Sequence, residues 1–202
     1  MVEVHTGVDA HSGMHVDQGA LPGEHPGRAS NPIIKVHDIA WLEFEKPDLV
    51  KAEAFATAFG FTVPHRTTEE VHLRGTETGA PCVIIRKGNR TRFVGAAFLA
   101  ADESDVLVLG KLTGNRVSRL PESIGGIGVT LHGPGGQPVR VVAGMNELPS
   151  LPGQRAHTFN FDDPLTRVNA TQRPPREPAR VQRLGHVVIS RTSYLENLNW
   201  YL

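Results

Sequence analysis

The feature that most constrains the fold is a strand–helix unit that begins at Val36 and recurs along the chain. Residues Val36 to Phe44 are rich in β-branched and aromatic side chains, which is typical of a strand. Pro47 and Asp48 then begin a helix, and Asp48 is placed to cap its free backbone N–H groups. Gly60 ends the helix, because glycine adopts the left-handed conformation at little steric cost. The spacing of its apolar residues predicts one buried face, made of Leu49, Ala52, Phe55, Ala56 and Phe59.

This unit continues into three predicted strands, which complete a βαβββ module. The strands are Thr62 to Arg66, Glu70 to Arg74 and Cys82 to Lys87, separated by turn-rich segments. His65 and His72 lie in the first two, and we expect them, like His37 and His132, to be surface or hydrogen-bonded histidines.

A second module of similar length begins at Phe93 to Leu99. Asp102 caps its predicted helix, Gly114 ends it, and the buried face is expected to hold Val106, Leu109 and Leu112. Two strands follow, at Gly126 to His132 and at Pro138 to Ala143, joined by a glycine-rich hairpin turn. Two modules with the same order of elements indicate a structural repeat.

A third copy starts near the end of the chain and is cut short. Leu184 to Ile189 predicts its strand, and Ser193 with Glu196 predicts a capping box at the start of its helix. The apolar side of that helix would hold Tyr194, Leu195, Leu198, Tyr201 and Leu202. A lone strand and helix cannot bury these side chains. We therefore expect the segment to pack against the first domain or to form a homo-oligomer with another copy of the chain.

These patterns divide the chain into four regions. Residues 1–32 are predicted to be a disordered tail, because the segment has too few large apolar groups to offset its ordering entropy. Residues 33–145 form the two-module domain, 146–183 a linker rich in proline and arginine, and 184–202 the start of a truncated second domain. The tail histidines match no metal-site spacing.

Composition excludes several classes of function. Lysine and arginine number 21, as do aspartate and glutamate, so no net charge favours nucleic acid or an anionic membrane. No apolar run is long enough to span a bilayer, no signal-peptide core is present, and Cys82 is the single cysteine. We expect a cytoplasmic protein in which Cys82 is a small buried apolar residue. The glycine clusters lack the residues that complete a dinucleotide fingerprint or a phosphate loop.

The repeat, with Phe59-Gly60-Phe61 after its first helix and Leu184-Gly185-His186-Val187 in its third strand, resembles the vicinal oxygen chelate superfamily. This superfamily includes glyoxalase I, bleomycin-resistance proteins and extradiol ring-cleavage dioxygenases. The resemblance implies an α+β fold of paired βαβββ modules. The chain looks most like the amino-terminal part of a two-domain extradiol dioxygenase, which cleaves an aromatic vicinal diol with O₂ at Fe(II), or at Mn(II) in some members.

The resemblance also implies where the metal ligands belong. They are two histidines, on the first strands of the third and fourth modules, and a glutamate on the last strand. The first histidine corresponds to His186, and such a set leaves adjacent iron positions open for diol and O₂. In the first two modules, alignment with His186 places Asp38, Gly95 and Arg140 at the ligand positions. Glycine has no ligand atom and arginine is permanently cationic, so this domain is expected to be a metal-free scaffold.

The 202 residues therefore hold one of three expected ligands, and we expect this chain alone to retain no iron and to be inactive. No catalytic and no cofactor-binding residue is assigned. The alternative hypothesis is a non-catalytic scaffold, or a small-molecule-binding protein of the glyoxalase or bleomycin-resistance type.

Overall fold

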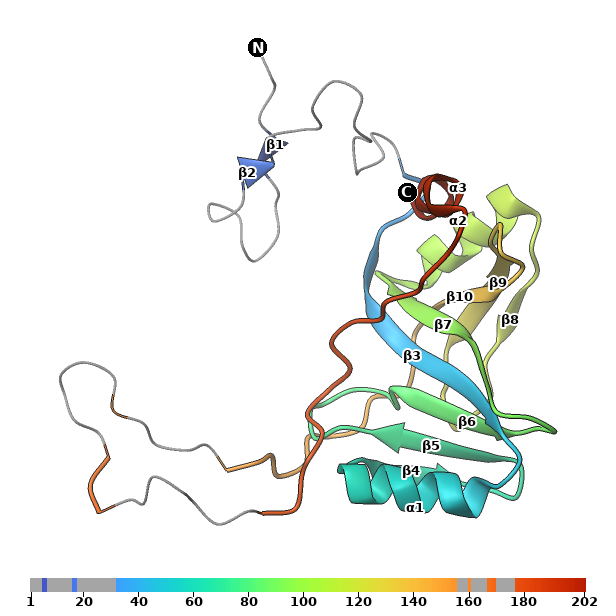
Figure 1. Cartoon of the computed structure of the whole chain (residues 1–202). Helices are drawn as coiled ribbons and strands as arrows, with labels where there is room; N and C mark the ends of the chain where they lie inside the picture. The colour runs from blue at the N-terminus through green and yellow to red at the C-terminus, as the bar shows by residue number, and fades with distance from the viewer. Residues whose placement is uncertain (1–4, 7–15, 18–31, 156–159, 161–166, 170–176) are drawn as a thin grey trace.

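One mixed eight-stranded sheet organises the chain (Figure 1). The computed structural model describes residues 5–6, 16–17, 32–155, 160, 167–169 and 177–202. The first module comprises β3 (Val36–Lys46), α1 (Leu49–Phe59), β4 (Thr62–Arg66), β5 (Glu70–Arg74) and β6 (Val83–Lys87). The second comprises β7 (Arg92–Ala100), α2 (Glu103–Thr113), β8 (Val117–Arg119), β9 (Ile127–His132) and β10 (Pro138–Ala143).

The strand order shows that the two modules are related by an approximate two-fold axis. The order is β4-β5-β6-β3-β7-β10-β9-β8, and the central strands β3 and β7 pair antiparallel. Each first strand is parallel to the last strand of its own module, β3 to β6 and β7 to β10. The predicted α+β class with paired βαβββ modules is thus confirmed.

Most predicted elements of the eight-stranded sheet lie within a residue or two of their expected bounds, and one strand of this sheet was not predicted. β8 has only three residues, Val117, Ser118 and Arg119, of which two are exposed. Such a segment shows no hydrophobic alternation. It becomes a strand because it pairs antiparallel with β9 at the edge of the sheet.

Both helix caps form as predicted, whereas the buried faces of the helices are narrower than expected. Asp48 accepts a hydrogen bond from the Lys51 backbone N at 3.0 Å, and Asp102 accepts one from the Asp105 backbone N at 3.1 Å. On α1, Leu49 and Ala56 are buried, but Phe55 is 72% exposed. The prediction that Phe55, Phe59 and, on α2, Leu112 are buried is therefore wrong. Each helix contacts the sheet along one narrow stripe of residues. Phe55 and Phe59 lie outside this stripe on α1 and stack on each other, with ring centroids 6.0 Å apart.

The core consists of three clusters. One lies between α1 and the strands of the first module, and a second lies between α2 and the strands of the second. The third occupies the opposite face of the sheet, here called the helix-free face, at the junction of the two modules. Its buried members are Ala40, Trp41, Ile84, Ala97, Ile124 and Val142.

The carboxy-terminal segment differs from its prediction. Residues 184–189 form no strand, because no neighbouring strand offers them backbone partners, and half of them are exposed. The helix α3 (Tyr194–Tyr201) does form. The prediction of a capping box is wrong. The Ser193 side chain makes no capping hydrogen bond to the backbone, and its Oγ instead accepts a hydrogen bond from Asn197 Nδ2 at 3.0 Å.

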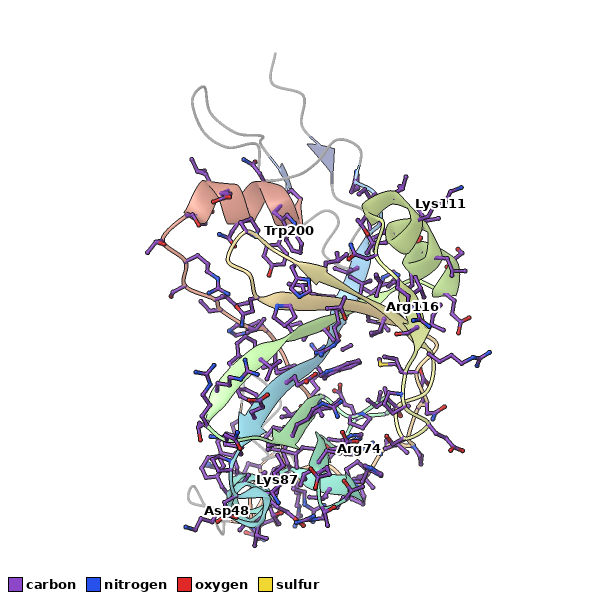
Figure 2. All side chains as sticks on the ribbon, turned by 90° about the vertical axis from the view of Figure 1, so that its right-hand side faces the viewer. Asp48, Arg74, Lys87, Lys111, Arg116 and Trp200 are labelled. Atoms are coloured by element: carbon purple, nitrogen blue, oxygen red, sulfur yellow. The ribbon has the colours of Figure 1, made fainter. Side chains whose placement is uncertain are left out.

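The helix α3 rests partly on the second module. Trp200 lies over Gly133, and Tyr201 meets Phe98 edge-on with ring centroids 6.3 Å apart. Figure 2 shows Trp200 on the side of α3 that faces the sheet. Other apolar residues of this helix, Tyr194 and Leu195 among them, remain exposed. The expected contact with the first domain is thus present but small.

Two further observations concern the amino-terminal region and membranes. The short strands β1 (His5–Thr6) and β2 (Val16–Asp17) pair antiparallel, while the rest of the predicted tail through residue 31 lies outside the described residues.

Among the helices that the structure describes, none is long and apolar enough to cross a membrane.

Candidate functional site

The helix caps show which residues of the three modules are equivalent. Asp48, Asp102 and Ser193 each precede the first residue of a helix. Trp41, Gly95 and His186 each stand seven residues before these caps. The alignment of Asp38 with His186 was therefore wrong, because it matched strand sequences without fixing the strand-to-helix distance. The residue equivalent to His186 in the first module is Trp41.

The positions equivalent to His186 are closed to ligands in both modules. Trp41 is only 2% exposed and packs in the central cluster with Ile84 and Ile124. A Cβ atom at Gly95 would lie 2.2 Å from the Pro138 carbonyl oxygen, so that strand pair admits no side chain there. Neither residue offers a metal-binding atom. Tight packing occupies the space that a metal and its substrate would need.

A buried carboxylate next to this apolar centre joins the two modules. Glu43 on β3 is almost fully buried, and it accepts hydrogen bonds from Arg86 of the first module, at 3.1 Å, and from Arg140 of the second. Arg140 stands at the predicted glutamate position and is held as an ion-pair partner. Because Glu43 faces two guanidinium groups, its charge is compensated although it is nearly out of contact with water.

The ion-pair network extends into a histidine cluster on β4 and β5. Arg86 also donates to Glu70, whose other carboxylate oxygen lies 2.9 Å from His72 Nε2 and 3.8 Å from His65 Nε2. The two imidazole centroids are 4.6 Å apart. Burial lowers the pKa of His72, against a smaller opposing effect of Glu70, so its imidazole is neutral at pH 7. Imidazole nitrogens and carboxylate oxygens are metal-ligand atoms.

This cluster was not identified as a site from the sequence, although a signal exists. β4 and β5 form a tight hairpin in which His65 is directly paired with His72. Glu70 lies two residues from His72 and therefore shares its face of the strand. In the part of the chain that the structure describes, His65, Glu70 and His72 are the one group of three such side chains whose ligand atoms lie within 4.8 Å of one another.

The structure places His186, the predicted metal ligand, apart from this cluster. His186 is exposed and lies in the extended segment before α3. Among the described residues it belongs to no group of three histidine, cysteine or acidic side chains close enough to hold an ion. The residues present around His186 do not fit an iron site, and its role as a ligand stays a prediction.

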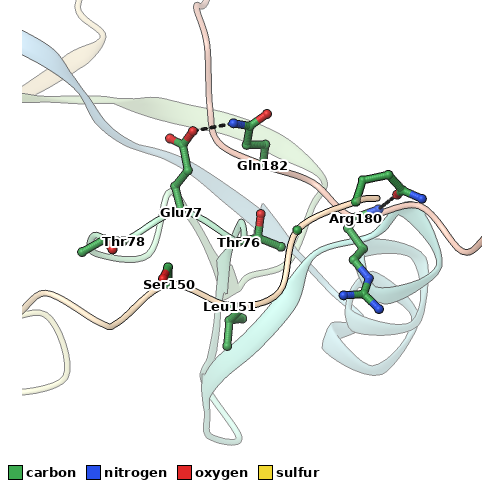
Figure 3. A pocket seen from close by; sticks show the side chains of 9 residues that line it. Thr76, Glu77, Thr78, Ser150, Leu151, Arg180 and Gln182 are labelled. Carbon is green, nitrogen blue, oxygen red and sulfur yellow. Dashed lines mark hydrogen bonds between the residues drawn. The ribbon is translucent and has the colours of Figure 1, made fainter. Parts of the chain in front are cut away.

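Both ends of the predicted linker dock onto the first module. Arg74 is buried and donates to the carbonyl oxygens of Gly75, Glu77 and Pro149. The backbone N–H of Thr76 donates to Val181 O at 2.9 Å. These segments border a cavity of about 600 Å³ that is open to solvent on one side, where Gln182 donates to Glu77 at 2.6 Å (Figure 3). The lining is mostly polar: Thr76, Glu77, Thr78, Ser150, Leu151, Gly153, Gln154, Arg180 and Gln182.

The single cysteine packs as predicted from the sequence, although it is only partly buried. Cys82 packs against the cluster beneath α1, and burial raises the pKa of its thiol. A thiol that resists ionisation is a poor nucleophile. Cys82 is therefore part of the packing.

Comparison with solved structures identifies proteins that share this fold. A Mn(II)-bound glyoxalase from Novosphingobium aromaticivorans matches 60% of this chain and 44% of its own, with a TM-score of 0.52 and 21% identity. Homoprotocatechuate 2,3-dioxygenase from Arthrobacter globiformis matches 61% of this chain and 41% of its own, with a TM-score of 0.53 and 20% identity. The enzyme of the same name from Brevibacterium fuscum, in complex with 3,4-dihydroxyphenylacetate, gives the same values.

These matches define the fold class. The chain has the paired-module fold of the vicinal oxygen chelate proteins, as the sequence predicted. It aligns with less than half the length of these three structures. No protein-family model and no curated protein sequence matches the chain.

Proposed function

We propose that this chain corresponds to the amino-terminal portion of a two-domain non-haem Fe(II) extradiol dioxygenase, whose first domain does not bind the catalytic iron. The whole enzyme would take an aromatic vicinal diol and O₂ as substrates and cleave the ring outside the diol. Fe(II), or Mn(II), would belong to the second domain, where His186 would be the first ligand.

One observation carries this proposal. The residue seven positions before each helix cap is Trp41 in the first module, Gly95 in the second and His186 in the third. The first two positions are closed by packing, and only the third offers a ligand atom. This difference between modules is what the resemblance leads one to expect between a scaffold domain and a metal-binding domain.

In this proposal the first domain serves as a rigid support. Glu43, Arg86 and Arg140 tie its two modules together across β3 and β7. Arg74 and the backbone of Thr76 hold the chain segments that lead toward His186. No described residue of the domain would contact the reacting atoms, so none is a catalytic residue.

The test has two parts. Anaerobic Fe(II) titration of the 202-residue chain, with a catechol-cleavage assay, should show no iron binding that depends on His186 and no turnover, because one imidazole cannot replace three ligands. The gene should be sequenced beyond the codon for Leu202. A further module pair with a histidine on a first strand and a glutamate on a last strand is expected. Stoichiometric iron that His186→Ala abolishes, or ring cleavage by the chain itself, would refute the proposal.

The cavity beside Thr76 favours a second candidate, a small-molecule-binding scaffold of the glyoxalase or bleomycin-resistance type. Its volume of about 600 Å³ lies within the range of ligand pockets. A stop codon directly after Leu202, together with saturable ligand binding that Arg180→Ala abolishes, would favour this candidate over the dioxygenase.

A further inference from the structure

We propose that His65, Glu70 and His72 form a binding site for Zn(II) on the helix-free face of the first module. The inference is independent of the proposed dioxygenase function, since the site lies on β4 and β5. The position equivalent to the predicted iron ligand, Trp41, lies on β3, with β6 between that strand and β5.

The hairpin brings the three side chains together by local geometry. β4 and β5 pair antiparallel with His65 opposite His72, and only residues 67–69 separate the two strands. The turn is stabilised by Thr67, whose Oγ1 accepts from the backbone N–H groups of Glu69 and Glu70 at 3.1 and 3.0 Å. The donor atoms therefore sit on neighbouring, hydrogen-bonded strands, and little entropy remains to be lost on binding.

The distances between the donor atoms suit a small divalent ion. Ligand atoms around tetrahedral Zn(II), at about 2.0–2.1 Å from the metal, lie about 3.3 Å from one another. Glu70 Oε1 lies 2.9 Å from His72 Nε2 and 3.8 Å from His65 Nε2, one value on each side of that separation. Rotation of the half-exposed His65 side chain can bring its nitrogen nearer. The chain thus needs only a small side-chain adjustment to bind.

The second oxygen of Glu70 is already held by Arg86, which leaves Oε1 for the metal. Such outer contacts orient ligand carboxylates in metalloproteins. The positive charge of Arg86 does not stand alone near the site, because Arg86 also donates to the buried Glu43. Two carboxylates, Glu70 and Glu43, therefore offset the guanidinium groups of Arg86 and Arg140, and a divalent cation meets no net positive field.

The proposed zinc site is buried except on the side of His65. His72 is 0% exposed, the Glu70 side chain 12% and the His65 side chain 34%. An ion would enter past His65, and a water molecule there would complete four-coordination. Two imidazoles and one carboxylate are a known ligand set of Zn(II) sites, whereas Mg²⁺ and Ca²⁺ prefer oxygen ligands alone.

The experiment is a Zn(II) titration of the full 202-residue chain against a chromophoric chelator, with Co(II) as a spectroscopic probe. One equivalent of Zn(II) is expected to bind, and Co(II) should give the intense visible absorption of a tetrahedral site. His65→Ala removes a ligand near the surface and should weaken binding by about a hundredfold, at least as much as the loss of an outer-shell partner. Zinc should raise the melting temperature of the natural chain and leave that of His65→Ala unchanged.

Two controls separate this site from other histidines. His132→Ala removes an exposed strand histidine and should leave the zinc affinity unchanged. Replacing the four tail histidines, His5, His11, His15 and His25, by alanine should also leave it unchanged. Absence of binding, an unchanged affinity in His65→Ala, or loss of binding in the tail variant would each overturn the proposal. The iron and sequencing tests of the dioxygenase can fail without affecting these results.

Discussion

Gly95 provides the sharpest test of the claim that the ligand position of the second module is closed. A Cβ atom at Gly95 would lie 2.2 Å from the Pro138 carbonyl oxygen. That oxygen belongs to β10, which pairs in parallel with β7. An ordinary contact needs about 3.5 Å, so Gly95→Ala must move the two strands apart by about 1 Å.

The size of the effect follows from the packing on both sides. β7 is a central strand, held between β3 and β10, so it cannot move away from Pro138 without disturbing its pairing with β3. Overpacking a well-filled site costs about 1–3 kcal/mol, and we expect the upper end, about 3 kcal/mol. For a chain of this size that corresponds to a fall in melting temperature of about 6–12 °C.

The assay is thermal and urea unfolding of Gly95→Ala, with Gly185→Ala as the matched control. A Cβ atom at Gly185 meets nothing within 4 Å, so the control should not destabilise the chain and should raise the free energy of unfolding by at most about 1 kcal/mol. If Gly95→Ala met no contact with Pro138, it would instead stabilise the folded chain by about 0.4–1 kcal/mol, because alanine restricts the unfolded state. A Gly95→Ala protein as stable as the natural chain would show that β7 and β10 admit a side chain, and the reasoning would fail.

Three further predictions concern the core, the thiol and the carboxy-terminal helix. Trp41→Ala should lower the free energy of unfolding in urea by about 3–5 kcal/mol, because it empties the centre between the modules; a loss below 1 kcal/mol would contradict this. Cys82 should react with a disulfide reagent far more slowly in the folded chain than in urea, because burial raises its thiol pKa. Its protonated form is favoured by folding, so stability should fall as the pH rises above about 8.5; Cys82→Ala should remove that dependence. Finally, Trp200→Ala should release α3 from Gly133 and increase its hydrogen exchange, while sheet protection stays unchanged.

Local sequence signals determined the elements of the fold. The caps at Asp48 and Asp102 and the glycine at Gly60 act on their own helix ends, so their effect is independent of the rest of the chain. The repeated order of elements then predicted the paired modules, since each module must bury its apolar faces in the same way. The hairpin that joins His65 to His72 was also within reach of the sequence, because its register depends on a short turn.

The tertiary structure alone decided which residues are buried and which meet. Phe55 and Leu49 carry the same apolar signal, but only Leu49 lies on the stripe that the sheet covers. Glu43 and Arg140 are distant in sequence, and their ion pair exists because β3, β7 and β10 lie side by side. Residues 184–189 have the composition of a strand and yet form none, because a strand needs a neighbour to pair with its backbone and composition cannot supply one.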